Sequence, residues 1–473
     1  MSQADELEAA AEGLPGAVSL APSSVVPALG GELVVEGDSF RAGLLQAGPL
    51  AVAGLAANGA NVVVTVLLAR LLTTRGYGTL NVLTGLFLIV SMPGSAVIVA
   101  VVRRVTGGAS AHLVQRWARR MHRRAVVGVV AFAVVVVAAG PWLTRLLNQH
   151  DVVGVDTILV AGAVWILLCL DRGLLQAHRS YRALSANLLV EGGVRTAAML
   201  TLVAVGLGPS GAAAGVLIAE VVTAVHARMM ADRVWTAEGR REHVTTRRRA
   251  DRRWRSAFRP DPDLVAPPEE HRRLVVDLVT ALVALAMTAL LQNIDVIVLG
   301  REAPAESGSY AAVSVASKAL VFGAVVLGGY LLPEAAIRWR EGGHALRQLA
   351  VTLLLLGIPT VLLLTVALAA PHLLLSVVFS SRYLGAESAF LPLVLAMICL
   401  SITVILTMYL LAVGRRWITG LLVLGAIVAT AAVAQGHGVP RTTALADLAV
   451  QAGLAVATMI GFALVHHRRL RPS

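Results

Sequence analysis

The sequence predicts an all-α integral membrane protein of about twelve transmembrane helices, arranged as two pseudo-symmetric six-helix bundles around a central cavity. Apolar stretches recur from Gly43 to Val465. A bilayer core of roughly 30 Å requires about 20 apolar residues per helix, and 79–102, 125–147 and 274–300 all reach that length. Hydrophobic residues make up 57% of the 473 positions and charged residues only 14%, which leaves too little polar surface for a soluble protein.

The expected spans fall into two sets of six. The first set is 44–71, 79–102, 125–147, 153–175, 184–206 and 209–230, and the second is 274–300, 308–335, 348–370, 386–413, 418–436 and 443–465. Residues 1–42 are acidic and carry no Lys or Arg before Arg41, so they lack the positive start of a secretion signal. We expect them to form a disordered cytoplasmic tail.

Arginine predicts the orientation of the chain in the membrane. Thirty Lys and Arg residues lie in the connections on one side of the twelve spans, against five on the other side. Cytoplasmic loops are enriched in Lys and Arg. We therefore expect a multi-pass protein of the bacterial cytoplasmic membrane with both termini in the cytoplasm.

Matching sequence features in the two halves indicate an internal repeat. Tyr77 and Tyr310 lie 233 residues apart, and the stretches LLQAHRSY and LLAVGRRW, which end at Tyr181 and Trp417, lie 236 apart. Pro93 and Pro333, and Pro141 and Pro371, are separated by similar intervals. The predicted division is a six-helix bundle at 43–230, a basic cytoplasmic linker loop at 231–273, the first four helices of a second bundle at 274–413, and two further helices with a basic tail at 414–473.

Several of these motifs carry a family resemblance, in order from residue 43 to residue 417. LLARLLTTRGYG after Asn58 and Asn61, LLQAHRSYRALSANLLVEGGVR, LLQNIDVIVLG, and FSSRYLGAESAFLPLVLAM at 379–397 resemble the bacterial polysaccharide-export, or O-antigen flippase, family. That family is part of the superfamily of multidrug, oligosaccharidyl-lipid and polysaccharide exporters. The resemblance implies a flippase that moves a sugar on a polyprenyl pyrophosphate from the cytoplasmic to the outer leaflet by alternating access of two bundles.

Other chemistries find little support in the residues. Lys318 lacks the glycines of a phosphate-binding loop, so we do not expect ATP hydrolysis by this chain. The first outer loop, TTRG, offers no acidic pair, which disfavours sugar transfer. Cys169 and Cys399 are isolated in apolar runs and are expected to pack as small residues, with no metal site. We expect no enzyme and no cofactor.

Charges inside spans are the sharpest candidates for a site, because an ionised group within the bilayer survives mainly in a wet cavity or beside a partner. Glu191 and Arg195 are four residues apart on one helix face. They either form a structural ion pair or place Arg195 on a pyrophosphate or sugar. Lys318 lies deep in its span and is expected to line the central cavity, where its point charge suits a phosphate that is bound and then released.

Two carboxylates and four amides complete the candidate set. Asp295 and Glu220 are candidates for binding a coupling cation or proton. The amides of Asn58, Asn61, Gln292 and Asn293 either bind sugar hydroxyls in the cavity or join helices to each other.

The linker loop combines many arginines with aromatic residues. We expect its cluster to dock on anionic lipid headgroups rather than on nucleic acid, because it lies beside two spans. The cluster comprises Arg247, Arg248, Arg249, Arg252, Arg253, Trp254 and Arg255.

Three functions remain open at this point. The leading one is flipping of a lipid-linked glycan, with that glycan and anionic lipids as partners and a polysaccharide polymerase or glycosyltransferases as further ones. A cation-coupled multidrug exporter is the chief alternative, although 4% aromatic residues and an excess of arginine count against a drug-binding cavity. A membrane scaffold for a polysaccharide synthase complex is the second alternative.

Overall fold

The computed structural model describes residues 53–470 apart from 55, 58, 107–110, 150, 250–267 and 341–345. In this part of the chain, ten helical stretches are long and apolar enough to cross a bilayer. One of them, Tyr181–Val234, contains two antiparallel helices joined by a bend. A shorter apolar helix, Gly59–Leu71, precedes the ten stretches. The predicted all-helical membrane fold is confirmed, and the chain is a multi-pass membrane protein.

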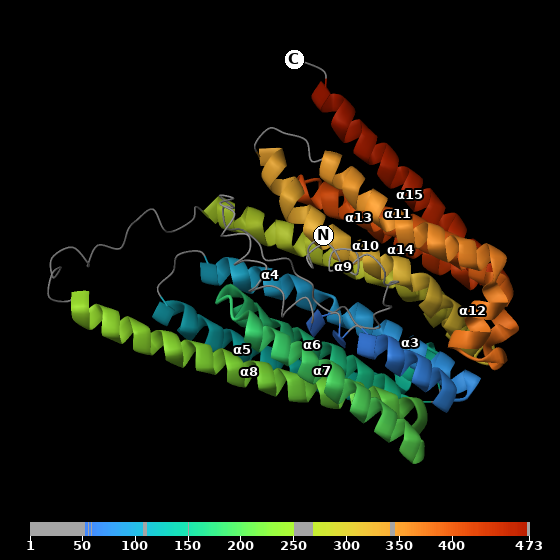
Figure 1. The fold of residues 1–473 in the computed structure, drawn as a ribbon, viewed down its shortest axis with the longest axis horizontal. Helices are drawn as coiled ribbons and strands as arrows, with labels where there is room; N and C mark the ends of the chain where they lie inside the picture. Colours follow the sequence, from blue (N-terminus) through green and yellow to red (C-terminus); the bar gives the residue numbers. More distant parts are fainter. Residues whose placement is uncertain are drawn as a thin grey trace, which may run out of the picture.

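The helices form two lobes that follow one another along the chain (Figure 1). The N-terminal lobe contains Gly59–Leu71, α3 (Thr74–Ser91), α4 (Pro93–Thr106), α5 (Ala111–Leu146), α6 (Val152–Ala177), α7 (Tyr181–Leu202), a π-helical turn (Val203–Leu207) and α8 (Gly208–Arg249). The C-terminal lobe contains α9 (Pro268–Glu302), α10 (Ser307–Arg340), α11 (Leu346–Ala369), α12 (Pro371–Val378), a 3-10 segment (Ser381–Ala389), α13 (Phe390–Ala412), α14 (Trp417–Ala434) and α15 (Pro440–Leu470).

Local sequence explains where several helices begin and bend. The Thr73 hydroxyl caps α3 by accepting a hydrogen bond from the Gly76 N–H at 3.1 Å. Pro93 begins α4 because proline supplies no N–H to continue α3, so the span predicted at 79–102 is two helices. Gly206 (φ 94°) and Gly208 (φ 56°) adopt left-handed backbone conformations between α7 and α8, which side chains with a Cβ rarely adopt.

The predicted boundaries of the linker loop need correction. α8 continues to Arg249 and α9 begins at Pro268, so both ends of the 231–273 stretch are helical. Hydropathy marks where a helix leaves the membrane, but its backbone hydrogen bonds continue in water when the residues there favour helix. The span starting at 386 is likewise preceded by α12 and a 3-10 segment.

The internal repeat matches the observed helix starts. α3 and α10 begin at Thr74 and Ser307, which are 233 residues apart, the same interval that separates Tyr77 from Tyr310. α7 and α14 begin at Tyr181 and Trp417, 236 residues apart, as the second pair of motifs predicts. The repeated residues therefore mark equivalent helices of the two lobes.

The two lobes are fastened to each other at the end where α3 and α12 meet, which we call the arginine-poor end (Figure 1). The Arg382 guanidinium donates to the carbonyls of Ala69 and Arg70, at 2.7 Å each, and the Tyr383 hydroxyl also donates to Ala69. In return, Arg70 donates to the carbonyl of Val377 at 3.1 Å. Each arginine thus caps the last turn of a helix in the opposite lobe, where carbonyls lack partners within their own helix.

Two more side chains complete this set of contacts, which we call the clasp. The Asn148 side chain donates to the backbone carbonyl of Arg301 at 2.7 Å, and the Gln149 side chain donates to the backbone carbonyl of Gly300 at 3.4 Å. A Cβ on Gly308 would lie 1.9 Å from the Thr74 carbonyl oxygen, so glycine there permits α10 and α3 to touch. The clasp joins the lobes at one end of the molecule. Away from that end, α8 and α15 finish on opposite edges of the molecule (Figure 1).

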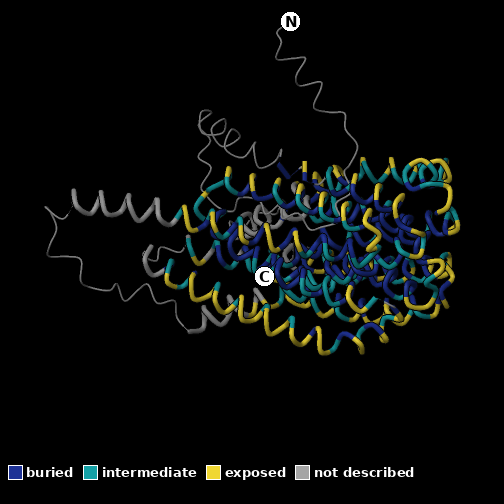
Figure 2. Tube along the Cα trace, turned by 90° about the horizontal axis from the view of Figure 1, so that it is seen from below, coloured by how far each residue is buried: buried dark blue, intermediate teal, exposed yellow. Residues whose placement is uncertain are grey.

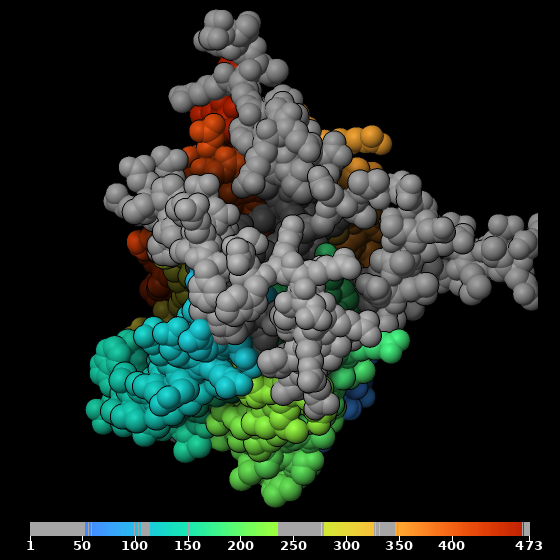
Figure 3. Space-filling view, turned by 90° about the vertical axis from the view of Figure 1, so that its left-hand side faces the viewer, coloured from blue at the N-terminus to red at the C-terminus, as the bar shows by residue number. Residues whose placement is uncertain are grey.

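Burial separates central helices from helices that face lipid. In the most apolar part of Ser307–Val325, in α10, 72% of the residues are buried. In that of Val114–Leu146, in α5, only 11% are buried. Figure 2 shows buried residues along the middle of the molecule and exposed ones on its outer faces. Viewed from the end opposite the clasp, the described N-terminal lobe in cyan and green lies below the C-terminal lobe in orange and red (Figure 3).

Candidate functional site

A buried network of charges and amides links α6, α7 and α8 in the N-terminal lobe. Arg172 donates to the Glu191 carboxylate at 2.6 Å and to the side-chain amide oxygen of Asn187 at 2.7 Å. Arg195 donates to the other oxygen of Glu191 at 2.6 Å and to Glu220. We call these five residues the N-terminal network. Its two arginines and two carboxylates alternate and cancel in charge.

Helical spacing and one glycine assemble this network. Asn187, Glu191 and Arg195 are successive i, i+4 neighbours and share one face of α7. α8 lies against that helix because Gly215 has no Cβ, which would otherwise lie 2.6 Å from the backbone nitrogen of Met199. This close approach brings Glu220 of α8 beside Arg195.

Aromatic rings cover the cationic members of the network. The Arg172 guanidinium lies 5.2 Å from the Trp165 ring centroid, and that of Arg195 lies 6.0 Å from the Phe87 ring centroid. The two rings contact each other edge to face at 6.3 Å. Cation–π attraction and packing hold both guanidinium groups in fixed orientations.

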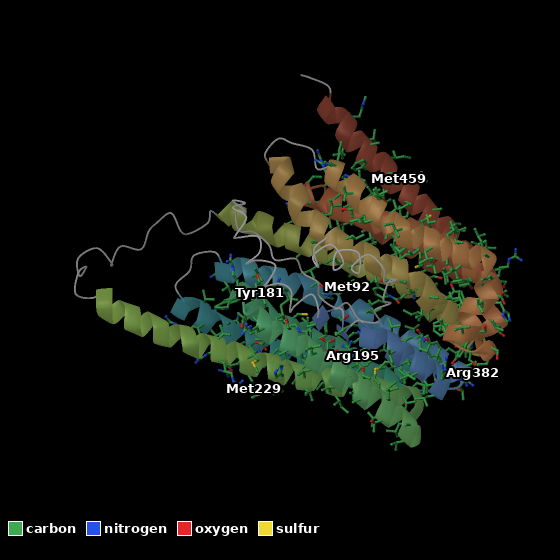
Figure 4. All side chains as sticks on the ribbon, viewed as in Figure 1. Met92, Tyr181, Arg195, Met229, Arg382 and Met459 are labelled. Carbon is green, nitrogen blue, oxygen red and sulfur yellow. The ribbon has the colours of Figure 1, made fainter. Side chains whose placement is uncertain are left out.

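Arg195 also borders a pocket inside the N-terminal lobe. Figure 4 labels the position of Arg195 within that lobe. The pocket has a volume of about 40 Å³, which holds a few water molecules. Its polar lining residues, besides Arg195, are Asn61, Thr65, Tyr77, Asn81 and Thr84. The structure thus places Arg195 and Asn61, two predicted ligands, on one pocket, while Asn58 lies outside the described residues.

A second polar network links α9, α10 and α15 in the C-terminal lobe. The Asp295 carboxylate accepts a hydrogen bond from the Tyr310 hydroxyl at 3.0 Å, and its other oxygen lies 3.8 Å from the Lys318 ammonium. Asp447 accepts a hydrogen bond from Gln451 at 3.1 Å and interacts electrostatically with both Asp295 and Lys318. With Asn293, these residues form what we call the C-terminal network.

Lys318 is held loosely by comparison with Arg195. Its ammonium has three N–H groups, and the hydrogen bond found for it among the described residues goes to the side-chain amide oxygen of Asn293 at 3.2 Å. The 3.8 Å contact with Asp295 is too long for a hydrogen bond. Lys318 therefore keeps N–H groups available while remaining 7% exposed.

The two networks approach each other across α3. Asn293, the hydrogen-bond partner of Lys318, packs against Gly85, whose absent Cβ would lie 3.3 Å from the Asn293 Cβ. The preceding residue of α3 is Thr84, which lines the N-terminal pocket. Lys318 consequently lies near the interface between the lobes.

The remaining predicted residues fall into three groups. Glu220 joins Arg195 in the N-terminal network, so a predicted coupling residue and a predicted substrate ligand form one ion pair. Gln292 is buried in α9, and its amide nitrogen has no hydrogen-bond partner among the described residues. Of the arginine-rich cluster, Arg247, Arg248 and Arg249 end α8, and the other members lie outside the described residues.

The structure adds residues that were not predicted. Arg172 and Asn187 complete the N-terminal network, and Asp447 and Gln451 complete the C-terminal one. A signal existed for the second pair, because Asp447 and Gln451 are four apart on one face of an apolar helix. Within the described residues, no group of three or more His, Cys, Asp or Glu side chains is arranged to hold a metal ion.

The helix arrangement is similar to that of several solved membrane transporters. A multidrug resistance MATE family transporter in an inward-facing conformation has a TM-score of 0.57 and 12% identity, and the match covers 85% of this chain and 96% of the other. A mutant of the Vibrio cholerae MATE transporter VcmN has a TM-score of 0.56 and 14% identity, and the match covers 91% of this chain and 98% of the other. A MOP superfamily transporter from Pyrococcus furiosus has a TM-score of 0.51 and 12% identity, and the match covers 90% of this chain and 94% of the other.

The sequence itself defines the family. A family model described as "Polysaccharide biosynthesis protein" matches residues 46–332, which is more than half of the chain. The protein belongs to this family, in agreement with the predicted resemblance. No curated protein sequence matches the chain at a significant level.

Proposed function

We propose that the protein is a flippase that moves a polyprenyl-pyrophosphate-linked saccharide precursor from the cytoplasmic to the outer leaflet, for the synthesis of cell-surface polysaccharide. The observation that carries this proposal is Lys318, a loosely held ammonium near the interface of two transporter lobes. An ammonium with unused N–H groups suits a phosphate that must be bound and later released. Membership of a polysaccharide biosynthesis family makes a lipid-linked sugar the leading cargo.

Arg195 has a different role in this proposal. Its guanidinium is fixed between Glu191 and Glu220 and borders a pocket with Asn61. Asparagine and threonine side chains in that pocket are suited to hydrogen bonds with sugar hydroxyls or water. We propose that Arg195 orients this polar lining and that Lys318 supplies the exchangeable charge.

The clasp supports alternating access. Its hydrogen bonds fasten the lobes at the arginine-poor end, which the bias of arginine among the loops would place at the outer face of the bacterial cytoplasmic membrane. In this proposal the clasped arrangement accepts cargo from the cytoplasm, and breaking the clasp releases it outside. Anionic lipids at the arginine-rich cluster and enzymes of polysaccharide assembly are the proposed partners.

Reconstituted vesicles provide the test. Purified protein is incorporated with a fluorescent polyprenyl-pyrophosphate sugar, and the fraction of label accessible to an external quencher is followed with time. We expect wild-type protein to move the label, Lys318→Ala to abolish movement, and Lys318→Arg to retain part of it. Arg145→Ala, which alters an exposed arginine that belongs to neither network, is the matched control.

Two results would contradict the proposal. Wild-type vesicles that extrude a cationic dye and leave the lipid-linked sugar in place would indicate a multidrug exporter. Vesicles that move neither compound, although the protein is folded, would favour a scaffold.

A further inference from the structure

A groove lies on the outer surface of the C-terminal lobe, between α14 and α15. Its volume is about 500 Å³, and its lining residues share one face of each helix. Two of them, Leu424 and Val428, are 58% and 46% exposed, so the groove opens to the surroundings of the lobe. Around membrane-spanning helices those surroundings are hydrocarbon. The groove is therefore a place where an apolar chain can lie against the protein.

The groove has the dimensions of a single hydrocarbon chain. On α14 it extends from Leu421 to Gln435, which at the rise of an α-helix is about 21 Å, most of the hydrocarbon thickness of a bilayer. Spread over that length, the volume corresponds to a cross-section of about 24 Å². A helix about 10 Å wide has a cross-section of roughly 80 Å². The groove is thus too narrow to hold a helix of a second protein.

Small residues keep the groove open. Half of its lining residues are glycine or alanine. At Gly425 the two helices touch, because a Cβ there would lie 3.1 Å from the Leu454 side chain. At Gly453 a Cβ would meet no atom within 4 Å. Small residues in membrane helices usually serve close helix packing, but Gly453 leaves free space above α15 instead.

One end of the groove is polar and lies at the arginine-poor end of the molecule. Gln435 and Thr442 line it there, on either side of the turn between α14 and α15. The turn packs against the end of α9, since a Cβ on Gly438 would lie 2.7 Å from that of Ala303. Arg441, next to Thr442, is exposed. A guanidinium beside an apolar groove suits a lipid whose headgroup carries phosphate.

From this groove, and resting on the proposed function, we propose that α14 and α15 bind the polyprenyl tail of the lipid-linked saccharide, with its phosphates beside Arg441 in the outer leaflet. An apolar chain gains no hydrophobic energy by moving from lipid to protein, so the groove selects by shape and by its charged end. Each isoprene unit carries a methyl branch. These branches fill the space above glycine and alanine, which a straight acyl chain leaves empty and without dispersion contacts.

The position of the groove relates the tail to the rest of the site. Ala446 and Val450 line the groove, and the residues after them, Asp447 and Gln451, belong to the C-terminal network, where two carboxylates face the ammonium of Lys318. α15 therefore presents the groove to lipid on one face and the network to the interior on another. The tail and the phosphate-binding lysine belong to the same lobe.

Photocrosslinking tests this assignment. Purified protein is reconstituted in vesicles with a polyprenyl phosphate that carries a diazirine in its tail, the vesicles are illuminated, and labelled peptides are identified by mass spectrometry. We expect label on the groove faces of α14 and α15, and loss of label when unlabelled polyprenyl phosphate competes. A phosphatidic acid with a diazirine in a straight acyl chain is the comparison probe, and it should label the groove weakly.

Variants that fill the groove give a graded readout. Gly453→Leu places a side chain in the free space and should lower labelling by about tenfold and slow flipping, whereas Gly453→Ala should have a smaller effect. Gly128→Leu is the matched control, because Gly128 is an exposed glycine of α5 whose Cβ would also meet no atom within 4 Å. Arg441→Gln should weaken labelling by the polyprenyl phosphate and leave labelling by the uncharged polyprenol unchanged.

Three results would overturn the inference. Equal labelling by the straight-chain probe would make the groove an ordinary contact with bulk lipid. Labelling of Gly453→Leu at the wild-type level would place the tail elsewhere. A disulfide between two copies of Gly453→Cys, with Cys169 and Cys399 replaced by alanine, would make the groove an interface between copies.

Vesicle flipping separates this inference from the function on which it rests. If wild-type protein flips the lipid-linked sugar and any of these three results is found, the tail site is wrong and the flippase stands. If wild-type protein does not flip the lipid-linked sugar, the proposed function fails, and the tail site fails with it.

Discussion

The N-terminal and C-terminal networks lie in two halves of one repeat, yet they occupy unrelated positions in it. With the 233-residue interval between α3 and α10, Lys318 corresponds to Gly85, and with the 236-residue interval between α7 and α14, Arg195 corresponds to Ala431. The duplication therefore preserved the helix scaffold, and each lobe has its own polar groups.

The two networks also differ in how tightly they hold their cations. Arg195 contacts two carboxylates at hydrogen-bonding distance, whereas Lys318 lies 3.8 Å from Asp295 and makes one hydrogen bond to an amide. A balanced, tightly bonded network fixes helices α6, α7 and α8 relative to one another. An unbalanced, loosely bonded network is suited to exchange. The comparison predicts that substitutions in the first network mainly affect stability and those in the second mainly affect transport.

The largest effect on stability is expected for Arg195→Met. Removing this guanidinium leaves Glu220 buried without a cation and Glu191 with Arg172 alone. Breaking a buried ion pair from one side typically costs about 3–5 kcal/mol, so we expect a marked fall in the free energy of unfolding. The measurement is the thermal unfolding midpoint in detergent, with ligand-free protein.

A double variant shows whether charge is the cause. Arg195→Met combined with Glu220→Gln restores the balance of the N-terminal network and should recover much of the lost stability. If the double variant is as unstable as the single one, packing of the arginine stem rather than its charge accounts for the effect.

A smaller loss is expected for Glu220→Gln alone. The amide still accepts a hydrogen bond from Arg195, but the network then has two arginines for one carboxylate. A buried group with an impaired partner costs about 1–3 kcal/mol, and we expect destabilisation in that range by thermal unfolding. Unchanged stability would mean that Glu220 is already neutral in the folded protein.

The corresponding substitution in the C-terminal lobe, Asp447→Asn, should raise the free energy of unfolding or leave it nearly unchanged. It removes the excess negative charge and leaves Lys318 with Asp295, so the free energy of unfolding should stay within about 1 kcal/mol of wild type or rise. Thermal unfolding of the two variants side by side is the measurement. A loss as large as that of Glu220→Gln would show that the two networks do not differ in charge balance.

The sequence was sufficient to predict the membrane fold and its division into two lobes. Helix length, apolar composition and repeated motifs are local properties, and the repeat intervals of Tyr77 with Tyr310 and of Tyr181 with Trp417 coincide with equivalent helix starts. The pairing of Glu191 with Arg195 also followed from their i, i+4 spacing. Helix length, composition and the ion pair depend on residues close together on one helix, and the repeat follows from comparing two such local stretches.

Contacts between helices were beyond such reasoning. Arg172 and Asp447 lie within predicted spans, but their partners come from other helices and depend on how those helices pack. The separation of Glu220 from Asp295 into two networks likewise depends on packing at Gly215 and Gly85. The clasp was unpredictable for a further reason, since it uses backbone carbonyls, which every residue carries.

The smallest effect on unfolding is expected at the clasp, which connects the lobes without belonging to either network. Arg382→Gln removes a charged donor from two helix-terminal carbonyls, on a side chain that is itself exposed. We expect the clasped population to fall by up to about tenfold, equivalent to roughly 1.4 kcal/mol, while unfolding of the lobes is unchanged. The measurement is the distance between spin labels at Arg75→Cys and Arg441→Cys, both exposed at this end, after Cys169 and Cys399 are replaced by alanine.

The control for this prediction is Arg145→Gln, an exposed arginine at the same end of the molecule. A change in the label distances for this variant would reflect general loss of positive charge. If Arg382→Gln leaves the distances unaltered but lowers the unfolding midpoint, the clasp is part of the folding core. The two lobes would then form one rigid unit. Changes in the C-terminal network could then not open the lobes at this end.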